Sequence, residues 1–212
     1  MARRGLDRFA IAVLEGIPKH LWGFPPRLMP MIVERLGPVR AVSWFLWNIP
    51  RYERTLKAFG GLRTHLLSTT ISLINGCRYC TFGHAYALEL IYLRDRGTML
   101  PLDEHAITEL CDVGCDEMRR RLAEALQQAD LDAEVPWIDR LIALATDARK
   151  PADRDDARIV HLIRMFGVLN ACGIVGDVNP DQAHDPLNKD DALKKRYAKL
   201  RAESDDEATA GS

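Results

Sequence analysis

Hydrophobic positions recur along most of the chain with helical spacing. In residues 117–129, for example, Met118, Leu122, Ala125 and Leu126 share one face, and most other positions are charged or polar. No segment shows the strict apolar–polar alternation of a half-buried strand. After a first amphipathic segment that ends before Gly23, the pattern predicts helices at about 27–36, 38–47, 51–59, 62–74, 77–95, 103–112, 117–129, 136–149, 153–174 and 194–201. We therefore expect an all-α fold.

Helix-breaking and capping residues set the expected boundaries. Pro50 predicts a break in the third segment, and Asn75-Gly76 suits the left-handed end of a helix. Asp103 and Asp116 are expected to cap the helices that follow them. We expect a single domain over residues 1–202, since the chain has the length of one large domain. The composition of residues 203–212 predicts a disordered tail.

The stretch from Asn75 to His84 carries the most distinctive chemistry. It contains Cys77, Cys80 and His84. The eleven residues before Cys77, from Leu66 to Gly76, carry no charge. If a helix begins near Cys77, steps of about 100° per residue place the three side chains within about 60° of one another. All three are therefore expected to face one pocket.

A redox-active cysteine needs a thiolate, so its pKa must be lowered. The start of a helix does this through free backbone amides and the helix dipole. His84, one turn after Cys80, is placed to accept its proton. This geometry favours Cys80 as the attacking thiol, Cys77 as the resolving thiol and His84 as the assisting base.

Three other interpretations fit parts of the pattern. Cys77, Cys80 and His84 are also zinc ligands, and His65 offers a fourth, so a metal-binding or redox-sensing protein is the main alternative. Against zinc, structural zinc cysteines usually sit on a turn, and no second ligand pair has zinc-finger spacing. A thioredoxin-like site lacks its surrounding βαβ pattern, and simple core packing explains two cysteines and a histidine on one face poorly.

Composition narrows the partners of the protein. The 212 residues contain 29 Lys plus Arg and 30 Asp plus Glu, so overall charge does not point to nucleic acid or to an anionic membrane. No stretch approaches the roughly 18 to 20 apolar residues that span a bilayer, and the run from Phe9 to Leu14 is too short for a signal peptide. Five cysteines do not form a disulfide scaffold. We expect a soluble, cytoplasmic protein that binds a small molecule or another protein.

The stretch Asn75-Gly76-Cys77-Arg78-Tyr79-Cys80-Thr81-Phe82-Gly83-His84 resembles the motif of the alkylhydroperoxidase D (AhpD)-like branch of the carboxymuconolactone decarboxylase superfamily. The preceding apolar helix and the following Ala85, Ala87 and Leu88 also fit. The resemblance covers about residues 45–175 and leaves the N-terminal helices and the C-terminal tail outside it.

The resemblance implies an AhpD-like helical bundle with extra N-terminal helices. It implies a homo-oligomer, either a trimer or a hexamer built from dimers, and an antioxidant thiol peroxidase that uses no cofactor and no metal. The substrate would be a hydroperoxide, and electrons would come from a dithiol such as a lipoylated protein. By position, Cys80 would be peroxidatic, Cys77 resolving and His84 part of the proton relay.

One position departs from the family pattern. The family has a glutamate where this chain has His65, so the relay would run between two histidines and would lack its carboxylate. The nearest upstream carboxylate, Glu53, lies too far back by spacing to replace it. His65 can still act as a base near neutral pH, or peroxidase activity could be weak or lost.

Other cysteines, histidines and aromatic residues have simpler interpretations. Cys111 and Cys115 are expected to be structural thiols, and Cys172 is expected in the core. We interpret His184 as a loop or surface residue. The cluster Trp44, Phe45 and Trp47 indicates core packing first and a subunit interface second.

Overall fold

The computed structural model describes the backbone of residues 2–210 and the side chains of residues 4–204. Within this part of the chain there are ten α-helices and no strand, so the all-α prediction is confirmed. The helices are α1 (Ala2–Trp22), α2 (Met29–Leu36), α3 (Pro38–Phe59), α4 (Gly61–Ile74), α5 (Arg78–Arg96), α6 (Glu104–Glu109), α7 (Cys115–Gln128), α8 (Val135–Ala145), α9 (Arg154–Val175) and α10 (Asp191–Ala210). Short 3₁₀ turns lie at Leu110–Asp112, Asp132–Glu134 and Pro186–Lys189.

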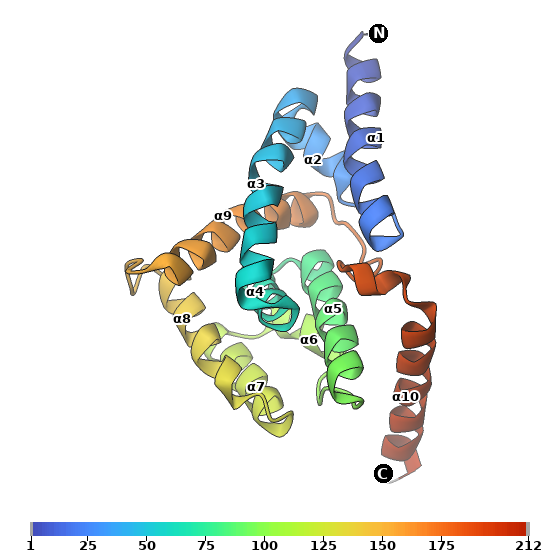
Figure 1. The fold of residues 1–212 in the computed structure, drawn as a ribbon, viewed down its shortest axis with the longest axis vertical. Helices are drawn as coiled ribbons and strands as arrows, with labels where there is room; N and C mark the ends of the chain where they lie inside the picture. The colour runs from blue at the N-terminus through green and yellow to red at the C-terminus, as the bar shows by residue number, and fades with distance from the viewer. Residues whose placement is uncertain (1, 211–212) are drawn as a thin grey trace.

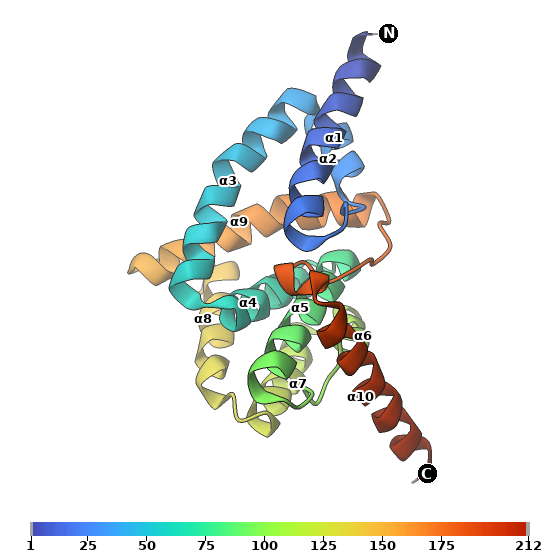
Figure 2. The same cartoon turned by 45° about the vertical axis from the view of Figure 1, so that its right-hand side comes forward.

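The helices are arranged around α4 and α5 (Figure 1). Helix α9 crosses behind α3 and is seen along most of its length in Figure 2. Helices α1 and α3 extend toward one end of the molecule and α10 toward the other, so the two termini lie far apart (Figures 1 and 2). The single domain over residues 1–202 stays a prediction.

Helix α4 is the centre of the fold. Its ten consecutive residues from Thr64 to Leu73 are all buried, and it packs against α3, α5, α8 and α9. The hydroxyl groups of Ser68 and Ser72 donate to the backbone carbonyls four residues earlier, both at 2.8 Å. Burial on every side explains why the run from Leu66 carries no charge, because a buried charge without a partner is costly.

The predicted break at Pro50 is wrong, because α3 continues through it. Proline removes one backbone donor from the helix. Two side chains in the same helix bond to carbonyls of the preceding turn: Asn48 Nδ2 donates to the carbonyl of Trp44 at 2.8 Å, and Arg51 Nη1 donates to that of Trp47 at 2.7 Å. The carbonyl that loses its donor at Pro50 is that of Leu46, so neither bond replaces the missing one. Helix α3 is held instead by packing against α1, α2, α4 and α9.

Other boundaries differ by a few residues. Asp103 caps α6 as expected, since its carboxylate accepts from the amide of Ala106. Gly114, not Asp116, is the N-cap of α7, and α8 ends at Ala145 rather than near residue 149. Helical backbone in α10 continues to Ala210, where a disordered tail from residue 203 was expected. Alanine and glutamate are strong helix formers, and Lys199 and Glu203 form an i,i+4 ion pair at 3.7 Å.

Helix α9 has the length and apolar composition of a helix that could cross a membrane. It also has the role of a core helix, because Ile159, Leu162 and Phe166 are buried against α3, α4 and α8. A core helix passes the same composition test. A soluble protein is therefore compatible with this structure, and the cytoplasmic location stays a prediction.

Candidate functional site

The two cysteines lie where the turn after α4 becomes α5. Gly76 has a φ of 73°, a conformation that favours glycine, and it reverses the chain between the two helices. Cys77 is the N-cap of α5, as the sequence predicts, and Cys80 lies in the first turn. Both thiols are free and about 98% buried or more.

The two thiols share hydrogen bonds, and their pKa values move in opposite directions. The hydrogen bond from Cys80 lowers the pKa of Cys77, and the backbone amides of Cys80 and Tyr79 lower it further against the effect of burial. The bond to Cys77, together with burial, raises the pKa of Cys80 well above its ordinary value. Cys77, at the helix start, is therefore the more acidic thiol of the pair, whereas sequence reasoning expected it to be Cys80.

His65 and His84 contact each other directly, with 3.0 Å between their Nδ1 atoms. The opposite ring nitrogen of His65, Nε2, lies 3.1 Å from Oδ2 of Asp185. A carboxylate thus completes the chain Asp185–His65–His84, although none was expected from the sequence. It comes from the loop before α10, 120 residues beyond His65.

The hydrogen bonds set the tautomers of the two rings. Although burial acts to raise it, the hydrogen bond from His65 holds the pKa of Asp185 below its ordinary value, so the carboxylate is ionised. In the neutral form of His65, Nε2 donates to Asp185 and Nδ1 accepts from His84. His84 is left with an unprotonated Nε2, the form of a proton acceptor. Burial, and the neighbouring His65 and His184, hold the pKa of His84 well below its ordinary value, so it is neutral near pH 7.

His184 lies in a loop, as one of the two interpretations had it, but it is not a surface residue. Its ring is 7% exposed and stacks on Trp22 with 5.5 Å between centroids, and it meets His84 edge-on at 5.2 Å. Asp181 lies 3.5 Å from His184 Nε2 and accepts a hydrogen bond of 2.9 Å from Tyr79. The loop containing residues 181–185 therefore forms one wall of the site.

Gly83 makes room for this loop. The amide of His184 donates to the carbonyl of Gly83 at 2.9 Å. A Cβ atom on Gly83 would lie 2.4 Å from the His184 ring, which is closer than real side chains approach. The glycine of the motif thus permits α5 and the loop to touch.

A cavity of about 370 Å³ opens onto these groups. Cys80, His65, His84, His184 and Asp185 all line it, and most of the remaining lining is apolar and comes from α1, α3 and α9. Cys77 does not line this cavity; it packs beneath Cys80 in a buried cluster that includes Cys172. The accessible thiol of the pair is therefore Cys80.

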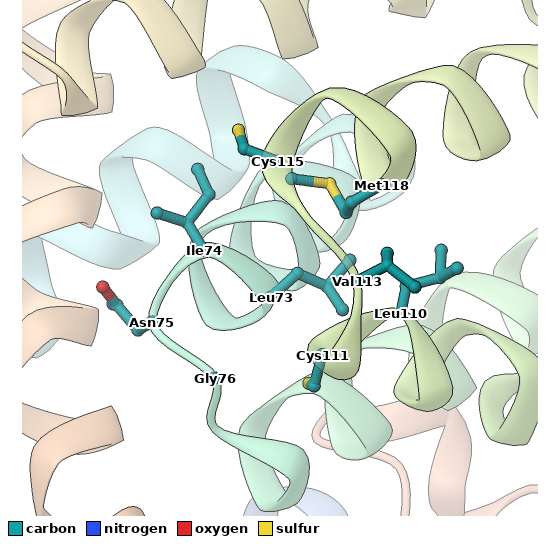
Figure 3. A pocket seen from close by; sticks show the side chains of 9 residues that line it. All are labelled: Leu73, Ile74, Asn75, Gly76, Leu110, Cys111, Val113, Cys115 and Met118. Atoms are coloured by element: carbon teal, nitrogen blue, oxygen red, sulfur yellow. The ribbon is translucent and has the colours of Figure 1, made fainter.

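The other candidate residues lie outside this arrangement. Cys111 and Cys115 line a separate pocket of about 230 Å³ beside the Asn75–Gly76 turn, and their side chains do not point toward each other (Figure 3). Phe45 lines the main cavity, Trp44 packs in the core beside it, and Trp47 is 66% exposed. In the part of the chain that the structure describes, no three or more His, Cys, Asp or Glu side chains are grouped so as to hold a metal ion.

No protein-family model, curated protein or solved structure matches the chain.

Of the four site residues predicted from the sequence, Cys80, His65 and His84 line one cavity; Cys77, which was expected to face the same pocket, is buried beside Cys80 outside it. The structure adds Asp185 and His184, which sequence reasoning missed. The only local signal was a His-Asp pair in a loop rich in turn-forming residues. No spacing rule connects that pair to His65, because the contact depends on how the loop folds back over α4 and α5.

Proposed function

We propose that this protein is a thiol peroxidase that reduces hydroperoxides through Cys80 and Cys77. The observation that carries the proposal is the opening of the cavity onto Cys80 beside the hydrogen-bonded chain Asp185–His65–His84. A nucleophile, a neutral base and an orienting carboxylate meet at one surface, which is the arrangement that activates a nucleophile.

The first step uses the unprotonated Nε2 of His84. Cys80 is a thiol in the resting site, and His84 takes its proton when substrate enters. The Cys80 sulfur attacks one peroxide oxygen; an S–O bond forms, the O–O bond breaks, and the departing alkoxide takes the proton from His84. Cys80 is oxidised to a sulfenic acid and the hydroperoxide is reduced to an alcohol.

The thiolate form of Cys77, the more acidic thiol of the pair, completes the cycle. It attacks the Cys80 sulfur, an S–S bond forms, and the hydroxyl group leaves as water after protonation. An external dithiol then reduces the disulfide and is itself oxidised to a disulfide. The low pKa of Cys77 thus serves the resolving step, in which the thiolate must already be present.

The family resemblance supplies the remaining parts of the proposal. The dithiol is a dihydrolipoyl group, for example on a lipoylated protein, and the protein works as a homo-oligomer, a trimer or a hexamer of dimers. No metal, cofactor, nucleic acid or membrane enters the reaction.

The test is consumption of cumene hydroperoxide with dihydrolipoamide as the reductant. Cys80→Ser should lower turnover by at least about a hundredfold, since it removes the nucleophile. Cys77→Ser should stop turnover but still give one sulfenic acid per chain, trapped with dimedone on Cys80. The exposed Cys115 provides the control, because Cys115→Ser should keep the wild-type rate. Equal turnover by wild type and Cys80→Ser would refute the proposal.

A further inference from the structure

The main cavity has one polar end and one apolar end. Most of its polar groups, Cys80, His65, His84, His184 and Asp185, are gathered on α4, α5 and the loop before α10; Glu53 of α3 also lines the cavity, among mostly apolar residues. At the other end the lining comes from α1 and α3, where Ile17, Leu21 and Leu46 are 48%, 41% and 69% exposed. The cavity therefore reaches the surface between two apolar helix faces.

The apolar part is long. On α3 the lining residues run from Val42 to Leu56, which corresponds to about 21 Å at a rise of 1.5 Å per residue. On α1 they run from Val13 to Trp22. A compact alkyl group would occupy only a fraction of this length. The shape fits an extended chain that lies along α3.

The polar end has an unused hydrogen-bonding atom. Among the described residues, His184 Nε2 is buried and has no hydrogen-bond partner; the nearest carboxylate oxygen, on Asp181, is 3.5 Å away. A buried polar atom without a partner is costly. An oxygen atom of a ligand bound next to Cys80 would satisfy it.

We infer that the cavity between α1 and α3 binds one unbranched hydrocarbon chain, with its oxygenated end at Cys80 and His184. Resting on the proposed peroxidase activity, this identifies the substrate class as hydroperoxides of long alkyl or fatty-acyl chains. Helices α1 and α2 precede the segment that resembles the AhpD-like family, so about half of the residues that line this chain-binding site lie outside the resemblance.

The first measurement is binding of redox-inert 1-alkanols, from hexanol to decanol, by isothermal titration calorimetry. Each added methylene should tighten binding about fourfold, which corresponds to about 0.8 kcal/mol per buried methylene. A negative heat-capacity change should accompany binding. Identical affinity across the series would overturn the inference.

The second measurement compares two substitutions on one helix. Val42 lines the cavity, whereas Val39 is 66% exposed and does not line it. Val42→Trp should weaken decanol binding by at least about tenfold by filling the cavity, and Val39→Trp should leave it unchanged. If Val42→Trp does not fold, Ile17→Glu at the exposed mouth should also weaken decanol binding, and wild-type affinity in that variant would contradict the inference.

The third measurement separates this inference from the proposed function. The ratio kcat/KM should rise from tert-butyl hydroperoxide to unbranched alkyl hydroperoxides, with the same dependence on chain length as alkanol binding. Chain-dependent alkanol binding without peroxide turnover would refute the peroxidase but support the chain site. Turnover that does not depend on chain length would support the peroxidase and refute the chain site.

Discussion

In the proposed reaction, proton transfer at the site depends on Asp185. It holds His65 in the tautomer that leaves His84 Nε2 free, and it does so through one hydrogen bond of 3.1 Å. Asp185 is a positioning residue, since its contact is with His65. In the proposed reaction its carboxylate supplies the negative charge that the AhpD-like motif has at the position of His65.

Asp185→Asn should lower kcat/KM for hydroperoxide by about tenfold to a hundredfold, the usual size for loss of an orienting partner. The acid limb of the pH–rate profile should move to lower pH, because the lost negative charge no longer stabilises a protonated histidine pair. Asp185→Glu should recover part of the rate.

The control for that variant is Asp191→Asn, at an exposed position in the first turn of α10. This variant should keep the wild-type kcat/KM and the wild-type pH–rate profile. An unchanged pH–rate profile in Asp185→Asn would show that the residue supports the loop alone.

At the scale of elements, the close approach of α9 to the start of α5 positions Cys77. A Cβ atom on Gly173 of α9 would lie 2.8 Å from Cys77 Sγ. Gly173 thus lets α9 pack directly on the thiol. The motif on α5 requires a small residue on a helix nearly one hundred positions away.

Gly173→Ala should destabilise the protein by about 1–3 kcal/mol, as overpacking a tight core does, and should speed alkylation of Cys77. Gly167→Ala on the same helix is the matched control, because nothing lies within 4 Å of the added Cβ. It should stabilise by about 0.5–1 kcal/mol through helix propensity. Urea denaturation measures both, and equal stabilisation by both alanines would contradict the packing argument.

At the scale of the whole molecule, a buried ion network fastens α8 to α9. The Asp156 side chain is 0% exposed and accepts hydrogen bonds of 2.6 Å each from Arg140 and Arg149. The amide of Ala152 donates to it at 2.8 Å. Burial acts to raise the pKa of Asp156, but Arg140, Ala152 and Arg149 together lower it to about 2.

A carboxylate with a lowered folded-state pKa stabilises the protein above its unfolded pKa of about 4, and that contribution is lost as pH falls from about 4 toward 2. Asp156→Asn should therefore lower the free energy of unfolding by about 3 kcal/mol at pH 7, the usual size for breaking a buried pair. It should also make the free energy of unfolding depend less on pH below about 4. Asp139→Asn, which breaks the exposed pair with Arg119, should cost less than about 1 kcal/mol. Urea melts at pH 7 and pH 3 test this, and similar losses in both variants would refute it.

The sequence by itself determined the all-α class, the order of the helices and the placement of Cys77, Cys80 and His84 on one helix start, because these depend on local periodicity and capping. It did not predict that α3 continues through Pro50, because the helix is held by packing against α1, α2, α4 and α9, which a local pattern does not record. Only the tertiary structure brought Asp185 and His184 to the site and built the cavity from α1 and α3. The contact of Asp185 with His65 joins residues 120 positions apart, and its formation depends on packing, which no local pattern records. The same packing made Cys77 the more acidic thiol and left Cys80 facing the cavity.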